Sequence, residues 1–159
     1  MQASPTSAFL LTQIGTHAAQ EFARRVAELD LTPPQAGLLR AVAIEPGRSQ
    51  QAIARQLGTP ATRLVALVDD LERRGLVQRR RNPDDRRLYA VALTEAGRAL
   101  MARIGRVARE HDDALLDGLD PAERERLREL LSRIAESQQL TSGVHPGYRT
   151  LGSTAGHDC

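Results

Sequence analysis

The feature that most constrains this chain is a pair of short apolar-faced segments, interrupted by a glycine and followed directly by an arginine-rich strand–turn–strand pattern. Ser49 is a typical helix N-cap and Gly58 a typical helix end. Thr59-Pro60 predicts the start of a second helix, with threonine as the cap and proline in the first turn. The stripe expected to face inward on this helix consists of Leu64, Leu67, Val68 and Leu71. Two helices joined by so tight a turn favour a helix-turn-helix.

The residues that follow this helix pair are strongly basic. Residues 76–80 and 88–93 are rich in strand-forming side chains, and 82–85 are typical of a turn. Residues 73–87 contain seven arginines against two aspartates, a net charge of +5 in a chain whose total is +2. Such a run alone is more often a solvated loop, but behind a helix-turn-helix it is the electrostatic footprint of a polyanion partner. The pattern therefore predicts a winged helix.

Helices are predicted on both sides of this unit. An apolar stripe at three- and four-residue steps predicts a helix over 7–29, and a capping box formed by Thr32 and Gln35 starts another that runs to residue 44. Thr94 is expected to cap a long helix to residue 116, and a second capping box at 120–123 opens the last helix. The apolar stripes of the first and last helices need a partner, and pairing with a second copy is the commonest solution.

These elements together resemble the MarR family of bacterial transcription regulators. The residues that carry the resemblance are Leu57-Gly58, the stretch 71–77 (LERRGLV), Asp85-Arg86-Arg87 and the stretch 93–97 (LTEAG). The similarity covers residues 7–138. It implies a mainly α fold with a small β-hairpin, in which a winged helix-turn-helix is flanked by N- and C-terminal dimerisation helices. It also implies a homodimer that grips a palindromic operator and responds to a small molecule or an oxidant.

Four regions follow from this organisation. We expect an N-terminal dimerisation helix (1–31), a winged helix-turn-helix DNA-binding region (32–94), C-terminal dimerisation helices (95–139) and a flexible tail (140–159). The tail is rich in Gly, Ser and Thr and shows no periodic apolar face, so we expect it to be dispensable for DNA binding. The expected function is a dimeric, sequence-specific DNA-binding transcriptional regulator, acting as a repressor, that a small-molecule effector releases or modulates.

The expected DNA contacts lie on the second helix of the pair and on the wing. The candidates are Ser49, Gln50, Pro60, Ala61, Thr62, Arg63, Val65, Ala66, Arg79, Arg81, Asp85, Arg86 and Arg87. Arg63 is the best candidate for reading a base, since a guanidinium bonds bidentately to guanine; the alternative is an ordinary solvent-exposed arginine. Arg86 and Arg87 are the candidates for the minor groove, where the negative potential attracts guanidinium groups.

Three further expectations concern acidic residues and the basic strand. Asp85 is expected to position a neighbouring arginine at the hairpin tip. Arg79, Arg80 and Arg81 alternate along a strand and cannot all face one side, so at least one is expected to pair with Asp69, Asp70 or Glu72. Many relatives carry arginines where this chain has Ala66 and Asp70, so its affinity for DNA is expected to depend more on the wing.

The effector and the remaining functional classes are less constrained by the residues. The resemblance implies an aromatic or phenolic acid as effector, and His17 and His111 are the candidates to contact it, unless they are ordinary surface or core histidines. The alternative function is a metal-responsive regulator using His111 with Asp112, Asp113 and Asp117. Cys159 is the single cysteine, which argues against peroxide sensing through a thiol in the first helix. We expect no enzyme activity, no cofactor, no membrane partner and a cytoplasmic location.

Overall fold

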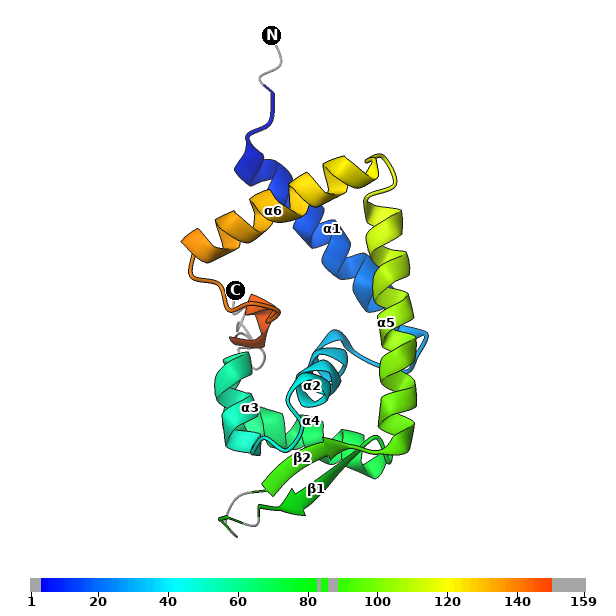
Figure 1. Ribbon diagram of the computed structural model, residues 1–159, viewed down its shortest axis with the longest axis vertical. Helices are drawn as coiled ribbons and strands as arrows, with labels where there is room; N and C mark the ends of the chain where they lie inside the picture. Colours follow the sequence, from blue (N-terminus) through cyan, green and yellow to red (C-terminus); the bar gives the residue numbers. More distant parts are fainter. Residues whose placement is uncertain (1–3, 83, 86–88, 150–159) are drawn as a thin grey trace, which may run out of the picture.

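The computed structural model describes residues 4–82, 84–85 and 89–149. The predictions for residues 86–88 and for residues 150–159 lie outside these ranges. Elements in the described part are α1 (Ser7–Ala27), α2 (Pro33–Ile44), α3 (Gln50–Leu57), α4 (Ala61–Arg73), β1 (Val77–Arg81), β2 (Tyr89–Leu93), α5 (Glu95–Leu115), α6 (Pro121–Ser137) and the short 3₁₀ helix η1 (Pro146–Arg149). In Figure 1, α2, α3, α4 and the hairpin form one end of the molecule, α1 and α6 form the other, and the long α5 connects the two ends. The predicted fold class, a mainly helical chain with one antiparallel hairpin, is confirmed.

Side-chain caps define most of the helix starts, as the sequence predicts. Thr32 Oγ1 accepts from the Gln35 N–H at 3.4 Å, and Gln35 Oε1 accepts from the Thr32 N–H at 2.8 Å, so the first capping box is complete. Asp120 and Glu123 form the second box, with both bonds at 2.9 Å. Each box satisfies two backbone donors that a helix start would otherwise leave unpaired.

The predicted cap at Thr59 is wrong. Helix α4 begins at Ala61, its N-cap residue is Pro60, and no side chain caps it. The Thr59 N–H instead bonds to the Ala54 carbonyl at 3.1 Å, closing the turn behind Gly58, whose φ of 67° is left-handed. This turn leaves Thr59 only 7% exposed, and its hydroxyl has no hydrogen-bond partner among the described residues. The backbone of the turn therefore takes Thr59 into the core.

The core lies at the end of the molecule that carries the hairpin. Its fully buried side chains are Leu38, Leu39, Val42, Ile53, Leu64, Val68, Leu71, Val77 and Val91, with Val26 from α1. At roughly 1.5–3 kcal/mol for each buried aliphatic side chain, this cluster is the main stabilising element of the fold. Helix α6 has no buried residue. The two ends of the molecule thus differ, one packed within the chain and the other leaving apolar side chains exposed.

The expectation of a tail without a core is wrong for residues 140–149, which we call the C-terminal strap. After α6 the chain turns back toward the other end of the molecule, contacts α2 and forms η1 (Figure 1). Tyr148 is 6% exposed and belongs to the core, and Val144 packs against it. The sequence pattern missed this because a single aromatic anchor has no periodicity, so only its contacts in the fold reveal that it docks.

Candidate nucleic-acid interface

Helix α4 presents an open face that is free of the core. Leu64, Val68 and Leu71 are fully buried, which turns the opposite side outward. On the second half of this helix Asp69 and Arg73 are exposed. Over its first half and just before it, the exposed side chains are Pro60, Ala61, Thr62, Arg63, Val65 and Ala66. All six are predicted contact residues. No side chain caps α4, and the Arg63 and Leu64 N–H groups both donate to the Pro60 carbonyl at 3.1 Å. The Ala61 and Thr62 N–H groups therefore remain for a phosphate at the helix start.

Arg79 connects the wing to both helices of the helix-turn-helix. Its guanidinium donates to Glu72 and to Asp69, both at 2.5 Å, and its Nε donates to Gln50 Oε1 at 2.8 Å. Burial by itself would lower the pKa of Arg79, but the bonds to the two carboxylates outweigh it and raise that pKa. The prediction that one strand arginine pairs with an acidic residue of α4 is confirmed. Arg79 is 17% exposed and each of its three guanidinium nitrogens donates to a group of the protein, so its geometry argues against the predicted DNA contact.

Asp70, one of the two positions where relatives carry arginine, is half-buried and is held by donors of the protein. Gln35 Nε2 donates to Asp70 Oδ2 at 2.7 Å, Arg73 pairs with Asp70 at 3.3 Å, and Arg74 lies 3.9 Å from it. These donors compensate the charge that would otherwise repel phosphate. The role of Gln35 was not predicted beyond the capping box; its second bond reaches α4 and ties α2 to the exposed helix.

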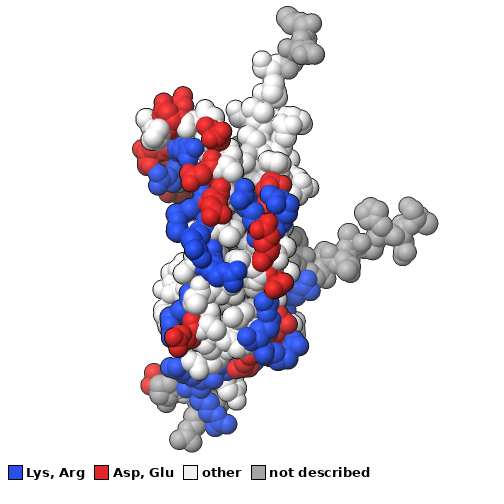
Figure 2. Space-filling view, turned by 90° about the vertical axis from the view of Figure 1, so that its right-hand side faces the viewer, with Lys and Arg blue, Asp and Glu red and all other residues white. Residues whose placement is uncertain are grey.

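The basic side chains at the wing lie at the lower end of the molecule (Figure 2). Arg80 and Arg81 are exposed near the end of β1, and so is Asp85 in the connection between the strands. Among the described residues neither Arg80 nor Arg81 makes an ion pair, and the same holds for Arg63 on α4. The cations of this surface are thus directed to solvent, where a phosphate backbone could reach them.

Two contacts fix the hairpin to α5 and explain the spacing of the stretch 93–97. Thr94 caps α5 and its hydroxyl also donates to the Gly75 carbonyl at 2.6 Å. A Cβ at Gly97 would overlap the carbonyl oxygen of Leu76, so the backbone of α5 approaches the start of the hairpin too closely for any side chain. The residue types of this motif therefore set where the wing leaves the body.

Ser49 and Gln50, the predicted phosphate contacts at the start of α3, already have partners in the protein. Ser49 Oγ accepts from the Ala52 N–H at 3.1 Å as the N-cap, and Gln50 Oε1 accepts from Arg79. A hydroxyl proton and an amide group still remain for an outside acceptor on these two residues. Their phosphate contacts stay a prediction.

The candidate effector residues lie at the junction of α1 and α5. The His111 ring is 5.7 Å from the Phe22 ring, centroid to centroid. Partial burial, followed by the nearby charge of Arg25, lowers the pKa of His111, and His17 acts on it in the same direction. His17 itself is exposed. The structure adds Arg25, whose buried Nε has no hydrogen-bond partner among the described residues and which no sequence motif marks.

The metal-responsive alternative gains no support. Asp113, one of the proposed metal ligands, already accepts a hydrogen bond from Arg124 at 2.8 Å. Within residues 4–82, 84–85 and 89–149 there is no group of three or more His, Cys, Asp or Glu side chains that could hold a metal ion. In the same residues, no helix is long and apolar enough to cross a membrane.

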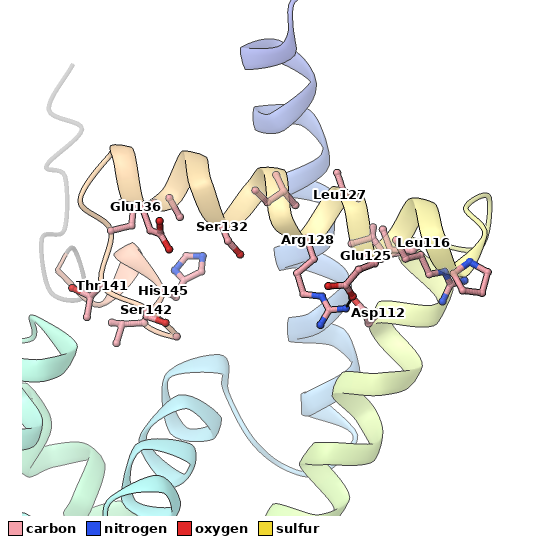
Figure 3. A pocket seen from close by; sticks show the side chains of 18 residues that line it. Asp112, Leu116, Glu125, Leu127, Arg128, Ser132, Glu136, Thr141, Ser142 and His145 are labelled. Carbon is pink, nitrogen blue, oxygen red and sulfur yellow. Dashed lines mark hydrogen bonds and ion pairs between the residues drawn. The ribbon is translucent and has the colours of Figure 1, made fainter.

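A large, open pocket lies beside α6, with a volume of about 1140 Å³. It is bounded by α6, by the end of α5 and by the C-terminal strap (Figure 3). Leu116 and Leu127 line one part of it, while Arg128 and Glu125 extend toward Asp112, and His145 points from the strap toward α6. The pocket is on the far end of the molecule from the wing.

A helix-turn-helix with an exposed second helix, followed by a basic two-stranded wing, defines a winged-helix DNA-binding protein. The family model described as the MarR family matches residues 29–88. A candidate transcriptional regulatory protein for the hcr operon of Thauera aromatica is 35% identical over 125 residues, covering 78% of this chain and 75% of that protein. The transcriptional regulator HosA of Escherichia coli O111:H- is 33% identical over 105 residues, covering 66% of this chain and 78% of HosA.

Solved structures agree with this assignment. The transcriptional repressor CouR, bound to a 23-mer DNA duplex, superposes with a TM-score of 0.73 at 37% identity, covering 82% of this chain and 92% of CouR. The chain belongs to the MarR family of DNA-binding transcriptional regulators. Its matched region includes the whole helix-turn-helix and the first strand of the wing.

Proposed function

We propose that this chain is a homodimeric repressor that binds a palindromic operator and is released by an anionic aromatic effector. The observation that carries the proposal is the separation of two surfaces. One is an open, cation-bearing face on α4 and the wing, and the other, at the opposite end, exposes large apolar side chains of α1 and α6. CouR, a repressor bound to a DNA duplex, supports the direction of regulation. Each copy would place α4 in the major groove of one half-site.

The apolar face that supports dimerisation is formed by α1 and α6. On α1, Phe9 is 58% exposed and Ile14 is 51% exposed, and on α6 Ile134 is 45% exposed. The N-terminal part of α1 is an uncharged column at the upper end of the molecule (Figure 2). Large exposed apolar side chains in one region mark an interaction site, and a second copy with the same face gives a closed twofold pair. The pocket beside α6 offers room for helices of that copy.

The division of work on DNA follows from which arginines are free to reach it. Arg63 is exposed on the first turn of α4, where side chains of a recognition helix meet base edges, so it is the proposed base-reading residue. Arg81, together with Arg86 and Arg87, is proposed to supply phosphate and minor-groove contacts from the wing. Asp85 is proposed to position the hairpin tip.

The effector proposal rests on a cluster of cationic and aromatic groups between α1 and α5. Arg25 holds a buried donor without a partner among the described residues, and a donor left in that state costs about 1–3 kcal/mol. His111 and Phe22 supply two tilted aromatic rings 5.7 Å apart, and His111 is close enough to Arg25 to feel its charge. A carboxylate on a planar ring satisfies both features, since the carboxylate would accept from Arg25 and the ring would pack beside Phe22. His17 lies at the exposed side of this cluster.

The experiment is a titration of the purified full chain into a palindromic duplex selected from a random pool, followed by fluorescence anisotropy. A light-scattering mass of two chains and saturation at one dimer per palindrome are expected. Arg63→Ala should weaken operator binding by about 1–3 kcal/mol while changing scrambled DNA less. Arg106→Ala, an exposed arginine on α5, is the matched control and should leave both unchanged. A monomer with no preference for the selected duplex would refute the proposal.

The effector arm uses 4-hydroxybenzoate as probe. It should raise the thermal midpoint of the wild type and release the duplex, and Arg25→Ala should lose both responses while Arg106→Ala keeps them. Stabilisation by the probe that survives Arg25→Ala would place the ligand elsewhere.

A further inference from the structure

The C-terminal strap docks on α2 through one buried aromatic residue. Tyr148 Oη donates to the Pro34 carbonyl at 2.8 Å, across 114 residues of sequence. Its ring lies over Gly37, where a Cβ would overlap the tyrosine hydroxyl, so the absence of a side chain at that position makes the seat for Tyr148. Burial raises the pKa of Tyr148, which keeps the phenol a neutral donor.

A second contact holds the strap where it passes α2. Arg40 Nη1 donates to the Gly143 carbonyl at 2.9 Å. Gly143 has a φ of 69°, a conformation that a side chain rarely adopts, and a Cβ there would lie 3.0 Å from the Arg40 guanidinium. Val144 packs on the core beside it. The strap is thus fastened at two points about five residues apart, both on α2.

Helix α6 needs this fastening because its own side chains do not bury. None of its residues is buried, and its beginning is tied to α5 by Arg124, which donates to Asp113 at 2.8 Å and to the Leu119 carbonyl at 3.1 Å. At its other end the chain enters the strap. Helix α6 therefore runs between a contact on α5 and the C-terminal strap, which is held on α2 at Gly143 and at Tyr148.

The residue that binds Tyr148 is directly followed in the chain by a residue that contacts α4, the proposed recognition helix. Pro34, which accepts the bond, precedes Gln35, and Gln35 Nε2 donates to Asp70 of α4 at 2.7 Å. A path of adjacent contacts thus joins the end of α6 to α4 through α2. The two ends of this path belong to surfaces with different proposed partners: α6 to the surface for the second copy, and α4 to the surface for DNA.

We propose that Tyr148 is a positioning residue that sets the distance and rotation between the two α4 helices of the dimer, and so determines which half-site spacing the protein accepts. The inference rests on the proposed dimeric DNA binding. One extra base pair moves the half-sites apart by about 3.4 Å and rotates them by about 35° around the duplex. When α6 is held at both ends, the DNA-binding end of the molecule resists that rotation relative to α6. When the contact at Tyr148 is lost, it can accommodate the rotation.

The test compares spacing preference, which a purely stabilising role would not alter. Palindromes with the selected half-sites and spacers of the selected length, or one and two base pairs longer or shorter, are titrated with each variant. The wild type should prefer its own spacing over the next by about tenfold, whereas Tyr148→Ala should reduce this ratio below about threefold. Tyr148→Phe keeps the ring but loses the bond to Pro34 and should fall between the two. Arg40→Ala, which releases the other fastening point, should change the ratio in the same direction.

The control is Ile53→Val, which removes one buried carbon from the core of α3 and lowers stability without touching the strap. Its spacing ratio should equal that of the wild type. A ratio for Tyr148→Ala within twofold of the wild-type ratio would overturn the inference while leaving the dimeric DNA binding intact. A wild type that binds no palindrome as a dimer would instead overturn the proposed function, and the inference with it.

Discussion

Replacing Arg79 with leucine removes the guanidinium that joins β1 to both α3 and α4. Leucine keeps much of the buried volume of the arginine stem, so the change isolates the polar contacts. Glu72, Asp69 and Gln50 each lose a hydrogen-bond donor from that guanidinium. Glu72 also accepts the backbone N–H of Arg79 at 3.0 Å, and that bond survives the substitution. The variant therefore tests the side-chain network and not the pairing of the strand.

The magnitude follows from the exposure of the partners. Asp69 is 52% exposed and Glu72 is 39% exposed, so solvent screens both ion pairs. Exposed pairs contribute at most about 1 kcal/mol, while hydrogen bonds to charged groups contribute about 1.5–3 kcal/mol when water is excluded. Between these limits, we expect Arg79→Leu to lower the free energy of unfolding by about 2 kcal/mol, or roughly 4–8 °C in Tm for a chain of this size.

The assay is urea unfolding followed by circular dichroism at a fixed protein concentration, because the proposed dimerisation would make apparent stability depend on concentration. Arg80→Leu is the matched control. Arg80 neighbours Arg79 on the same strand but is exposed, so its loss should change stability by no more than about 0.5 kcal/mol. If Arg79→Leu destabilises the chain no more than Arg80→Leu does, the network carries no stability and the reasoning is wrong.

The same variant separates a positioning role from a phosphate contact. Loss of a phosphate contact lowers the salt slope of DNA binding by about one, which is expected for Arg81→Ala. Arg79→Leu should weaken binding by loosening the wing while leaving that slope unchanged. A slope that falls equally in both variants would show that Arg79 contacts DNA.

Three more outcomes are expected. Gly97→Ala places a Cβ on the carbonyl oxygen of Leu76 and should destabilise the chain by about 1–3 kcal/mol in the same urea assay, whereas Gly118→Ala, with nothing within 4 Å, should not. Gln35→Ala loses the bond that its side chain accepts from the Thr32 N–H in the capping box and the bond that it donates to Asp70 of α4, and should lower the free energy of unfolding by about 1–2 kcal/mol. The raised pKa of Tyr148 means that the unfolded chain ionises first, so stability is fully present below the ordinary tyrosine pKa of about 10 and falls as the pH rises above it. Tyr148→Phe should remove that part of the alkaline decline, and an unchanged decline would show that Tyr148 is not buried in solution.

The features that the sequence predicts well are those that depend on neighbours along the chain. Both capping boxes, the Gly58 turn and the strand–turn–strand pattern follow from residues within a few positions of one another. The prediction that Thr59 caps α4 is wrong for a related reason. A rule based on neighbouring residues cannot show that the turn buries the Thr59 hydroxyl. Tyr148 and Arg25 are beyond such rules altogether, since their environments are built by α2 and by α5, far away in the sequence.

The net charge of +5 on residues 73–87 is not all available to DNA, because part of it is paired with carboxylates of α4. Three of its arginines, Arg73, Arg74 and Arg79, lie within 4 Å of carboxylates on α4 and compensate them. Asp69, Asp70 and Glu72 on α4 therefore do not present their full negative charge to DNA, and the helix keeps an exposed face with Arg63 as its cation. The remaining excess of positive charge belongs to Arg80, Arg81 and the residues beyond them in the hairpin. We therefore expect this chain to obtain its nonspecific attraction to phosphate from the wing and to read sequence through a nearly neutral helix.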